Sequence, residues 1–172
     1  MDNPEIILRE MKKEDIINLK KGFENQGWYR STELFENYFL DQKQKDRFVI
    51  VAEYEGFVAG YVTLLEHAKN GPFSEKKYPE ISDFNVFIKY QNKGIGDKLL
   101  NHCERLAHSF SKVITLGVGL HEGYGPAQRL YIKRGYIPDG SGVWYKDEPL
   151  AMNASCKNND DLVLYLSKRM TV

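Results

Sequence analysis

The chain has 172 residues, of which 42% are hydrophobic and 28% are charged, so we expect one folded domain over residues 1–172 rather than a disordered chain. Its 24 basic and 24 acidic residues cancel, which disfavours a nucleic acid or a membrane surface as partner. No run approaches the ~18 apolar residues of a membrane span, and the first residues lack the basic and apolar regions of a secretory leader.

Cysteine is scarce in this chain. Cys103 and Cys156 are too few for a disulfide scaffold, and they do not have the spacing of metal ligands. We therefore expect a protein of the reducing cytoplasm that holds no metal.

The N-terminal half is expected to form a strand, two helices and a β-hairpin. Apolar residues recur at helical spacing in the helices, and β-branched and aromatic residues dominate the strands. In chain order the predicted elements are a strand at Ile6–Leu8, helices at Glu14–Phe23 and from Ser31 onward, and an antiparallel hairpin of Arg47–Tyr54 and Phe57–Leu65 around the turn Glu55-Gly56.

The C-terminal half alternates strands and helices, which implies a parallel strand pair. A polar loop is expected at Glu66–Pro79, before this alternation begins. The predicted elements are a strand at Ile81–Lys89, a helix from Gly94 to Phe110, a strand at Val113–Leu120, a helix from Pro126 to Gly135, and strands at Tyr136–Tyr145 and Leu162–Leu166 around a polar connection at residues 146–161.

The most informative stretch is a strand that runs into glycines at the start of a helix. Gly94 and Gly96 follow the strand predicted for residues 81–89, with Lys93 and Lys98 beside them. A helix N-terminus offers unpaired backbone N–H groups and a partial positive charge, and glycines let a phosphate oxygen approach that backbone. The pattern indicates a phosphate site, with a plain tight turn as the alternative.

Spacing excludes two other phosphate motifs. A Walker loop needs Gly-Lys followed by Ser or Thr, whereas Lys93 precedes Gly94 here and Ile95 follows. A dinucleotide fingerprint needs a third glycine where Leu99 stands. We therefore expect neither a Walker-type nucleotide site nor a nicotinamide cofactor.

Two ordered motifs resemble those of the GNAT N-acetyltransferase superfamily. The segment Gln91-Asn-Lys-Gly-Ile-Gly96 is similar to its acyl-CoA signature, Gln/Arg-x-x-Gly-x-Gly/Ala, and Ala127-Gln-Arg-Leu-Tyr131-Ile-Lys-Arg-Gly135-Tyr136 is similar to its Ala-x-x-x-Tyr-x-x-x-Gly-Phe element. The order of strands and helices matches over almost the whole chain. The resemblance implies an α/β fold with a mixed, mostly antiparallel sheet, flanked by helices, whose two parallel central strands splay apart.

The resemblance also implies acetyl-CoA as the acyl donor. In the family the pantetheine arm inserts between the splayed strands, which correspond here to residues 81–89 and 113–120. Carried over by position, the residues along the acyl-pantetheine arm are Phe84, Asn85, Val86, Phe87 and Ile88. Those that hold the pyrophosphate are Gln91, Asn92, Lys93, Gly94, Ile95, Gly96, Asp97 and Lys98.

Tyr131 aligns with the family tyrosine that is often placed near the thioester sulfur, which implies that its hydroxyl protonates the departing CoA thiolate. Packing against the sheet is the alternative role for this ring. The amine must also lose a proton, and Asp83 is the candidate base, with capping of a loop as its alternative role. His121 and Glu122 are further candidates. Tyr124 departs from the family, since many members have an Asn there that touches the CoA arm.

The acceptor site in such enzymes is built from the connection between the N-terminal helices, the loop before the cofactor strand and the final strands. Aromatic rings and carboxylates in these segments suit a small cationic amine, although core packing is an alternative for the tryptophans. The expected substrate-binding residues are Trp28, Tyr29, Glu66 and Trp144.

The favoured function is therefore transfer of an acetyl group from acetyl-CoA to a small cationic amine or an amino-group metabolite. We expect the amine to attack directly in a ternary complex, in a monomer or a homodimer. The alternatives are acetylation of a protein or peptide amine, and an acyl-CoA sensor without turnover. A covalent acyl-cysteine route is disfavoured because Cys103 falls on the apolar stripe of the helix that starts at Gly94, and Cys156 lies in the polar stretch Ser155-Cys-Lys-Asn-Asn.

Overall fold

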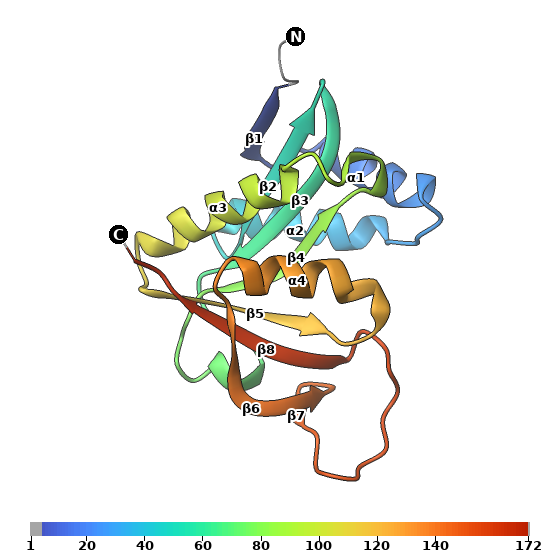
Figure 1. Ribbon diagram of the computed structural model, residues 1–172. Coiled ribbons are helices and arrows are strands. Elements are labelled where there is room, and N and C mark those ends of the chain that lie inside the picture. The colour runs from blue at the N-terminus through green and yellow to red at the C-terminus, as the bar shows by residue number, and fades with distance from the viewer. Residues whose placement is uncertain (1–4, 172) are drawn as a thin grey trace. The chain divides into compact units, whose positions relative to one another are not determined.

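The chain folds into a mixed sheet with helices, and the computed structural model describes residues 5–171 (Figure 1). The strands are mostly antiparallel, and β4 and β5 form a parallel pair, as the sequence predicted. The residues group into two compact units: those up to Leu65 with 82–105, and 66–81 with those from Leu106 onward. Strand β4 (Glu80–Val86) gives its first two residues to the second unit and the rest to the first.

The first unit contains the predicted hairpin and the two N-terminal helices. Its strands occur in the order β1-β2-β3-β4. Glu55 and Gly56 take φ angles of 52° and 80°, which suits the tight hairpin turn because both central residues of a type I′ turn need positive φ. The elements are β1 (Ile6–Glu10), α1 (Asp15–Asn25), α2 (Thr32–Gln44), β2 (Phe48–Tyr54), β3 (Phe57–Leu65), the end of β4 and the start of α3 (Ile95–His108).

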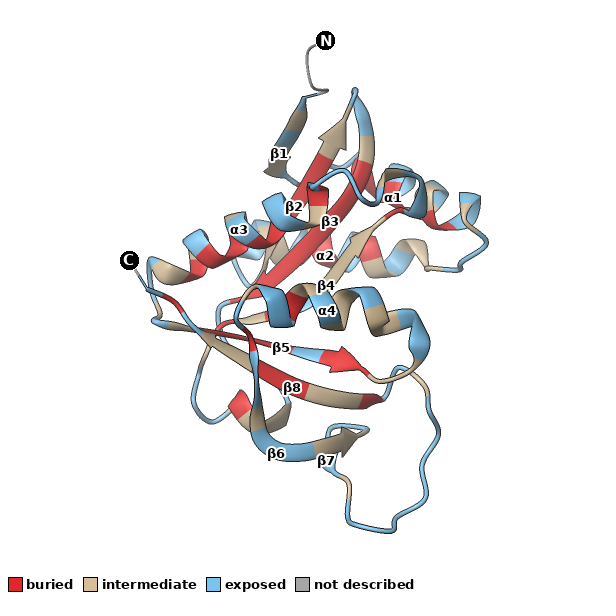
Figure 2. Cartoon of the chain, viewed as in Figure 1, coloured by how far each residue is buried: buried red, intermediate tan, exposed pale blue. Residues whose placement is uncertain are grey.

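Aromatic side chains dominate the core of the first unit. Buried residues lie along the middle of β2 and β3, as Figure 2 shows. The ring of Phe23 on α1 packs against Phe35, Tyr61 and Phe87 at centroid distances of 6.0, 6.3 and 5.2 Å. Gly22 touches the Phe87 ring so closely that a Cβ there would collide with it. Helix α1 can therefore approach this cluster only without a side chain at residue 22.

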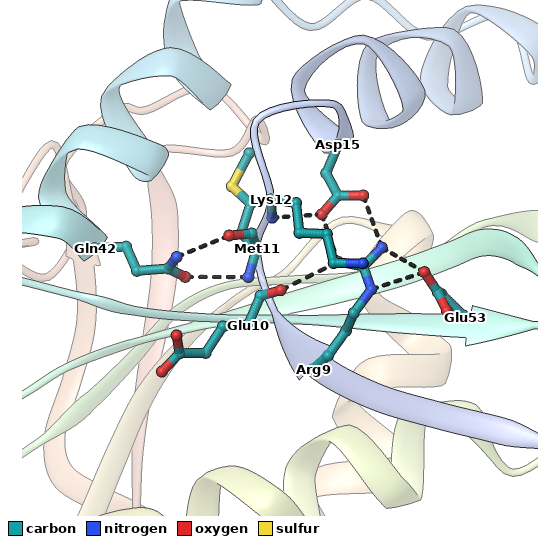
Figure 3. Close-up of polar contacts among 7 residues, drawn as sticks. All are labelled: Arg9, Glu10, Met11, Lys12, Asp15, Gln42 and Glu53. Carbon is teal, nitrogen blue, oxygen red and sulfur yellow. Dashed lines mark hydrogen bonds and ion pairs between the residues drawn. The ribbon is translucent and has the colours of Figure 1, made fainter.

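An ion-pair network joins β1, α1 and β2 (Figure 3). The Arg9 guanidinium donates to both carboxylate oxygens of Asp15, over 2.6 and 2.9 Å, and to Glu53 on β2. Asp15 is fully buried and also accepts the Lys12 N–H over 2.7 Å at the start of α1. The hydrogen bond to Asp15 above all raises the pKa of Arg9 above its usual range, so the guanidinium stays charged.

The second unit contains the C-terminal strands in the order β4-β5-β8-β6-β7. The parallel pairing joins Glu80 to Thr115 and Ile81 to Leu116. Thr115 is buried, and both its backbone N–H and its hydroxyl donate to the Pro79 carbonyl over 2.9 Å. The elements are β5 (Val113–Gly119), α4 (Gly125–Lys133), β6 (Ile137–Tyr145), β7 (Glu148–Pro149) and β8 (Leu162–Arg169).

Most element ends differ from the predictions by one to three residues, and three differences change the local structure. β4 ends at Val86 rather than residue 89, because the Tyr90 N–H donates to the Phe87 carbonyl and closes a 3₁₀ turn. α3 ends at His108, so Phe110 lies outside the helix and is 40% exposed. The polar connection after Tyr145 contains the short strand β7, which pairs with the end of β6.

Within residues 5–171, no helix is long and apolar enough to cross a membrane.

Substitution of Asp15 by Ala is expected to lower the free energy of unfolding by about 3 to 5 kcal/mol, because it leaves a partly buried arginine without its bidentate partner. Urea denaturation followed by circular dichroism measures the change. Glu24→Ala is the control: it removes an exposed i,i+4 pair with Lys20 and is expected to cost under about 0.5 kcal/mol. Similar losses in the two variants would contradict a structural role for the network.

Candidate functional site

The turn before α3 has the backbone geometry of an anion site. Asn92 and Gly94 take φ angles of 59° and 78°, and the first helical hydrogen bond runs from the Lys98 N–H to the Gly94 carbonyl over 3.1 Å. The N–H groups of residues 95–97 therefore precede the helical ladder. Gln91 fixes the start of the turn, because its side-chain amide donates to the Val86 carbonyl over 3.0 Å.

Exposure divides the residues predicted to hold pyrophosphate. Gln91 to Gly94 and Asp97 to Lys98 are exposed, and Gly96 is half-buried, whereas the Ile95 side chain is buried. The Ile95 side chain therefore packs in the core and does not line the turn. The Lys93 ammonium lies 5.1 Å above the Tyr54 ring, which holds a positive charge beside the turn.

The residues predicted along the acyl arm fall into two groups. Phe84, Asn85 and Val86 on β4 are half-buried. Phe87 is a core residue whose N–H donates to the Ala59 carbonyl, and the N–H of Ile88 donates to the Gln26 side chain over 2.9 Å. The N–H groups of residues 87 and 88 thus already have acceptors within the protein.

Asp83 is held by two tyrosines of the same unit. Its Oδ2 accepts hydrogen bonds from the Tyr38 hydroxyl on α2 over 2.9 Å and from the Tyr61 hydroxyl on β3 over 2.6 Å. Among the described residues, none donates to Oδ1. One oxygen of this half-buried carboxylate therefore orients the side chain, and the other is open to a ligand.

Both tyrosines are kept in their neutral, donating form. Burial, followed by the negative charge of Asp83, raises the pKa of Tyr38 and of Tyr61 above the usual value of a phenol. The Arg47 guanidinium lies 4.7 Å above the Tyr38 ring and donates to Asp41 and Thr63 over 3.1 Å. This arginine is thus ion-paired while it covers the ring.

The two aromatic residues predicted to bind substrate in the first unit lie in the connection between α1 and α2. Trp28 is 48% exposed and stacks on Phe23 at 6.3 Å, and Tyr29 is 81% exposed. Neither is a core residue. Both rings are accessible at the segment expected to face an acceptor.

Tyr131 lies on α4 in the second unit. Its side chain is 6% exposed, and its ring contacts Tyr136 edge-on at 5.8 Å. Pro126 lies in the first turn of α4, and Gly135 follows the helix at a φ of 89°, as predicted. The role of Tyr131 as a general acid stays a prediction.

His121 lies in the loop after β5, and both of its ring nitrogens have partners, one in that loop and one in the loop before β8. Nδ1 accepts the Gly123 N–H over 3.1 Å, and Nε2 lies 3.0 Å from Asp160 Oδ1, which the Tyr124 hydroxyl also reaches over 3.0 Å. Each nitrogen thus has one partner within the protein, and the role of His121 as a base stays a prediction. The Tyr124 ring lies against Gly119, where a Cβ would collide with it. The structure thus gives His121 and Tyr124 loop-fixing contacts.

Glu66 and Trp144, the other predicted acceptor residues, belong to the second unit. Glu66 is exposed directly after β3, and Trp144 is half-buried on β6. The Trp144 ring meets Tyr165 edge-on at 5.5 Å, and its Nε1–H donates to the Ser141 hydroxyl over 2.8 Å. Trp144 therefore contributes partly to local packing.

Comparison with known proteins identifies the family. The family model described as "Acetyltransferase (GNAT) family" matches residues 13–136. The chain belongs to the GNAT acetyltransferase family. No curated protein matches its sequence.

Solved GNAT structures share the fold at low sequence identity. The yncA protein of Salmonella typhimurium, solved with its cofactor acetyl-CoA, has a TM-score of 0.68 and 16% identity, with 95% of this chain and 93% of that chain covered. The PaiA N-acetyltransferase of Thermoplasma acidophilum, in complex with coenzyme A, has a TM-score of 0.67 and 16% identity, with 96% of this chain and 99% of that chain covered. The ribosomal-protein-alanine N-acetyltransferase of Brucella melitensis has a TM-score of 0.69 and 18% identity, with 95% of this chain and 99% of that chain covered.

Sequence reasoning missed the partners of the candidate base in this GNAT protein. Tyr38 stands among the apolar residues of its helix and Tyr61 within an apolar strand, so the sequence pattern singles out neither residue. Their hydroxyls carry no sequence signal, because Asp83 lies 45 and 22 residues away. Within residues 5–171, no group of three His, Cys, Asp or Glu side chains lies together as metal ligands would.

The folded GNAT protein is expected to lose stability as the pH rises from about 10 to 12. Burial, followed by Glu80, raises the pKa of Tyr165 to about 12, and those of Tyr38 and Tyr61 are also raised, so the unfolded chain releases these protons at a lower pH than the folded chain. Urea midpoints across this range measure the effect.

The Tyr165→Phe variant removes one of these groups and is expected to show a shallower decline. Ultraviolet titration of the folded protein supplies a second readout. A single midpoint near the ordinary value of about 10 for all 11 tyrosines would contradict the shifts.

Proposed function

We propose that the protein transfers an acetyl group from acetyl-CoA to a primary amine, with a small cationic amine or an amino-group metabolite as the favoured acceptor. Membership of the GNAT family carries this proposal, together with the positive-φ glycine that opens α3 after β4. Similar structures that were solved with acetyl-CoA or coenzyme A support the choice of donor.

The donor is proposed to bind along β4 and the turn that follows it. Phe84 to Val86 would border the acyl arm, and the exposed turn from Gln91 to Lys98 would hold the pyrophosphate. The N–H groups at the start of α3, which precede its ladder of hydrogen bonds, and the charge of Lys93 fit two phosphates, because the site combines backbone donors with a cation. Gly94 lacks the Cβ that would otherwise project into open space beside these donors.

Two side chains are proposed to handle charge and protons. Asp83 would meet the amine through Oδ1, since Oδ2 is held by the tyrosines. Tyr131 would donate its hydroxyl proton to the sulfur of the departing thiolate as the amine takes the acetyl group. The amine gains the acetyl carbon and loses one proton, and the donor leaves as the free thiol, so the exchange is balanced without a covalent enzyme intermediate.

A protein or peptide amine is the second candidate acceptor. The observation in its favour is the likeness to the ribosomal-protein-alanine N-acetyltransferase of Brucella melitensis, whose name states a protein substrate. That likeness stands at 18% identity and concerns the fold alone.

Release of free CoA thiol from acetyl-CoA is expected to depend on an added amine. The assay compares the protein without acceptor and with polyamines, aminoglycosides, amino acids and short peptides. Acceptor-dependent release supports an acetyltransferase and identifies the acceptor class. No thiol release with any acceptor, together with tight binding of acetyl-CoA, would contradict turnover and favour an acyl-CoA sensor.

The same assay tests the acid through a matched pair of variants. Tyr131→Phe is expected to slow thiol release about 100-fold or more while the affinity for acetyl-CoA stays the same. Tyr136→Phe removes a hydroxyl from the neighbouring buried ring and is the control for altered packing. Equal rates for the two variants would contradict the acid role.

Gly94→Ala is expected to weaken coenzyme A binding about 10-fold, because the added Cβ is strained at a φ of 78° and takes up open space at the turn where a phosphate would bind. Gly56→Ala is a matched control, because Gly56 also has a positive φ and open space around it but lies in the hairpin turn. Both variants are expected to lose about 1 to 2 kcal/mol of stability. Calorimetry that shows equal coenzyme A affinity for both would refute the phosphate site.

A further inference from the structure

One partly buried arginine of the first unit lacks a carboxylate partner. The guanidinium groups of Arg9 and Arg47 are ion-paired, to Asp15 with Glu53 and to Asp41. Arg30 is also half-buried, but within residues 5–171 no hydrogen bond or ion pair engages it. A half-buried cation without an anion is costly, and a bound anionic group would offset that cost.

Arg30 lies on the same aromatic cluster that holds Asp83. Its guanidinium carbon is 5.4 Å from the centre of the Phe23 ring, and Phe23 packs against Tyr61, whose hydroxyl donates to Asp83. Its positive charge also lowers the pKa of Tyr38 and of Tyr61 in part, so its field reaches the two phenols that hold Asp83. Arg30 and Asp83 do not pair with each other within 4.0 Å.

Arg30 and Asp83 contact the same aromatic cluster without pairing with each other. They therefore offer a ligand two separate binding points, one positive and one negative. The Asp83 carboxylate has one open oxygen, which suits an ammonium group. The Arg30 guanidinium is a planar fork that binds carboxylates in bidentate geometry. The exposed rings of Trp28 and Tyr29 adjoin Arg30 in the chain and leave this segment accessible.

We propose that the acceptor is an amine that also carries a carboxylate, and that Arg30 is the specificity-determining residue that binds this carboxylate while Asp83 binds the amine. The inference rests on the proposed acetyl transfer and narrows its acceptor from amines in general to amino acids. Polyamines and aminoglycosides, which carry no carboxylate, are disfavoured because they would bring a second cation to Arg30.

Binding to the protein saturated with coenzyme A tests the proposal without turnover. The probes are the common α-amino acids, β-alanine and γ-aminobutyrate, each measured by calorimetry beside its own amide. The protein is expected to bind at least one of the acids about 10-fold or more tightly than its amide, the preference expected from one charge-assisted hydrogen bond. The two longer amino acids report the spacing between the two attachment points.

Three variants identify the residue responsible. Arg30→Gln is expected to abolish the preference for acid over amide, and Arg30→Lys is expected to restore part of it. Lys43→Gln is the matched control, because the Lys43 ammonium also lies over an aromatic ring, 4.8 Å from the centre of Phe39, but at the end of α2. Thermal melting checks that each variant is folded.

The outcomes separate the acceptor from the reaction. The proposal is wrong if no carboxylate-bearing amine binds, if acid and amide bind equally, or if Arg30→Gln weakens coenzyme A instead, which would assign Arg30 to a donor phosphate. Turnover of amines without a carboxylate preference would leave acetyl transfer standing and overturn only this inference. An Arg30-dependent acid preference without any acetyl transfer would support the inference and overturn the proposed function.

Discussion

The hydrogen bonds from two buried tyrosines to one carboxylate organise the first unit. Tyr38 and Tyr61 come from a helix and a strand, and each would leave a polar hydroxyl in an aromatic core if it had no acceptor. Asp83 supplies one oxygen to both. The requirement fixes how α2, β3 and β4 meet, because a shift of β4 by one residue would turn Asp83 to the opposite face of the strand. The packing of the unit thereby holds the carboxylate of Asp83, the candidate base, in a fixed position.

Charge is distributed in this unit with few uncompensated groups. Arg9 secures β1, α1 and β2 with two carboxylates, and Arg47 is paired while it covers Tyr38. These pairs are structural because both members belong to the protein. Arg30 and the second oxygen of Asp83 stand apart from that pattern, and for this reason they are the positions at which we propose that a ligand supplies the opposite charge. The same contrast distinguishes His121, whose ring nitrogens are both engaged, from a free base.

Local signals predicted most of the fold. The turn at Glu55-Gly56, the stripe from Ile95 to Ala107 and the Pro126 to Gly135 helix depend on neighbours in the chain, and each was confirmed. The end of β4 and the strand β7 were missed, because the 3₁₀ turn from Phe87 to Tyr90 and the short pairing of β7 with the end of β6 leave no periodic pattern of side chains. The glycine turn was likewise found from its pattern. The tyrosine pair around Asp83 and the unpaired state of Arg30 were not, since both are defined by side chains that meet only in the folded unit.

The two cysteines differ in a way that bears on how this protein can be handled. Cys103 is buried on α3, and burial, followed by Glu104, raises the pKa of its thiol to about 12, whereas Cys156 is exposed in the long loop before β8 (Figure 1). Thiol reagents attack the thiolate at an accessible sulfur. A maleimide dye will therefore attach at one place in the natural sequence, in the loop that also carries Asp160, and a fluorescent reporter of the second unit needs no engineered cysteine.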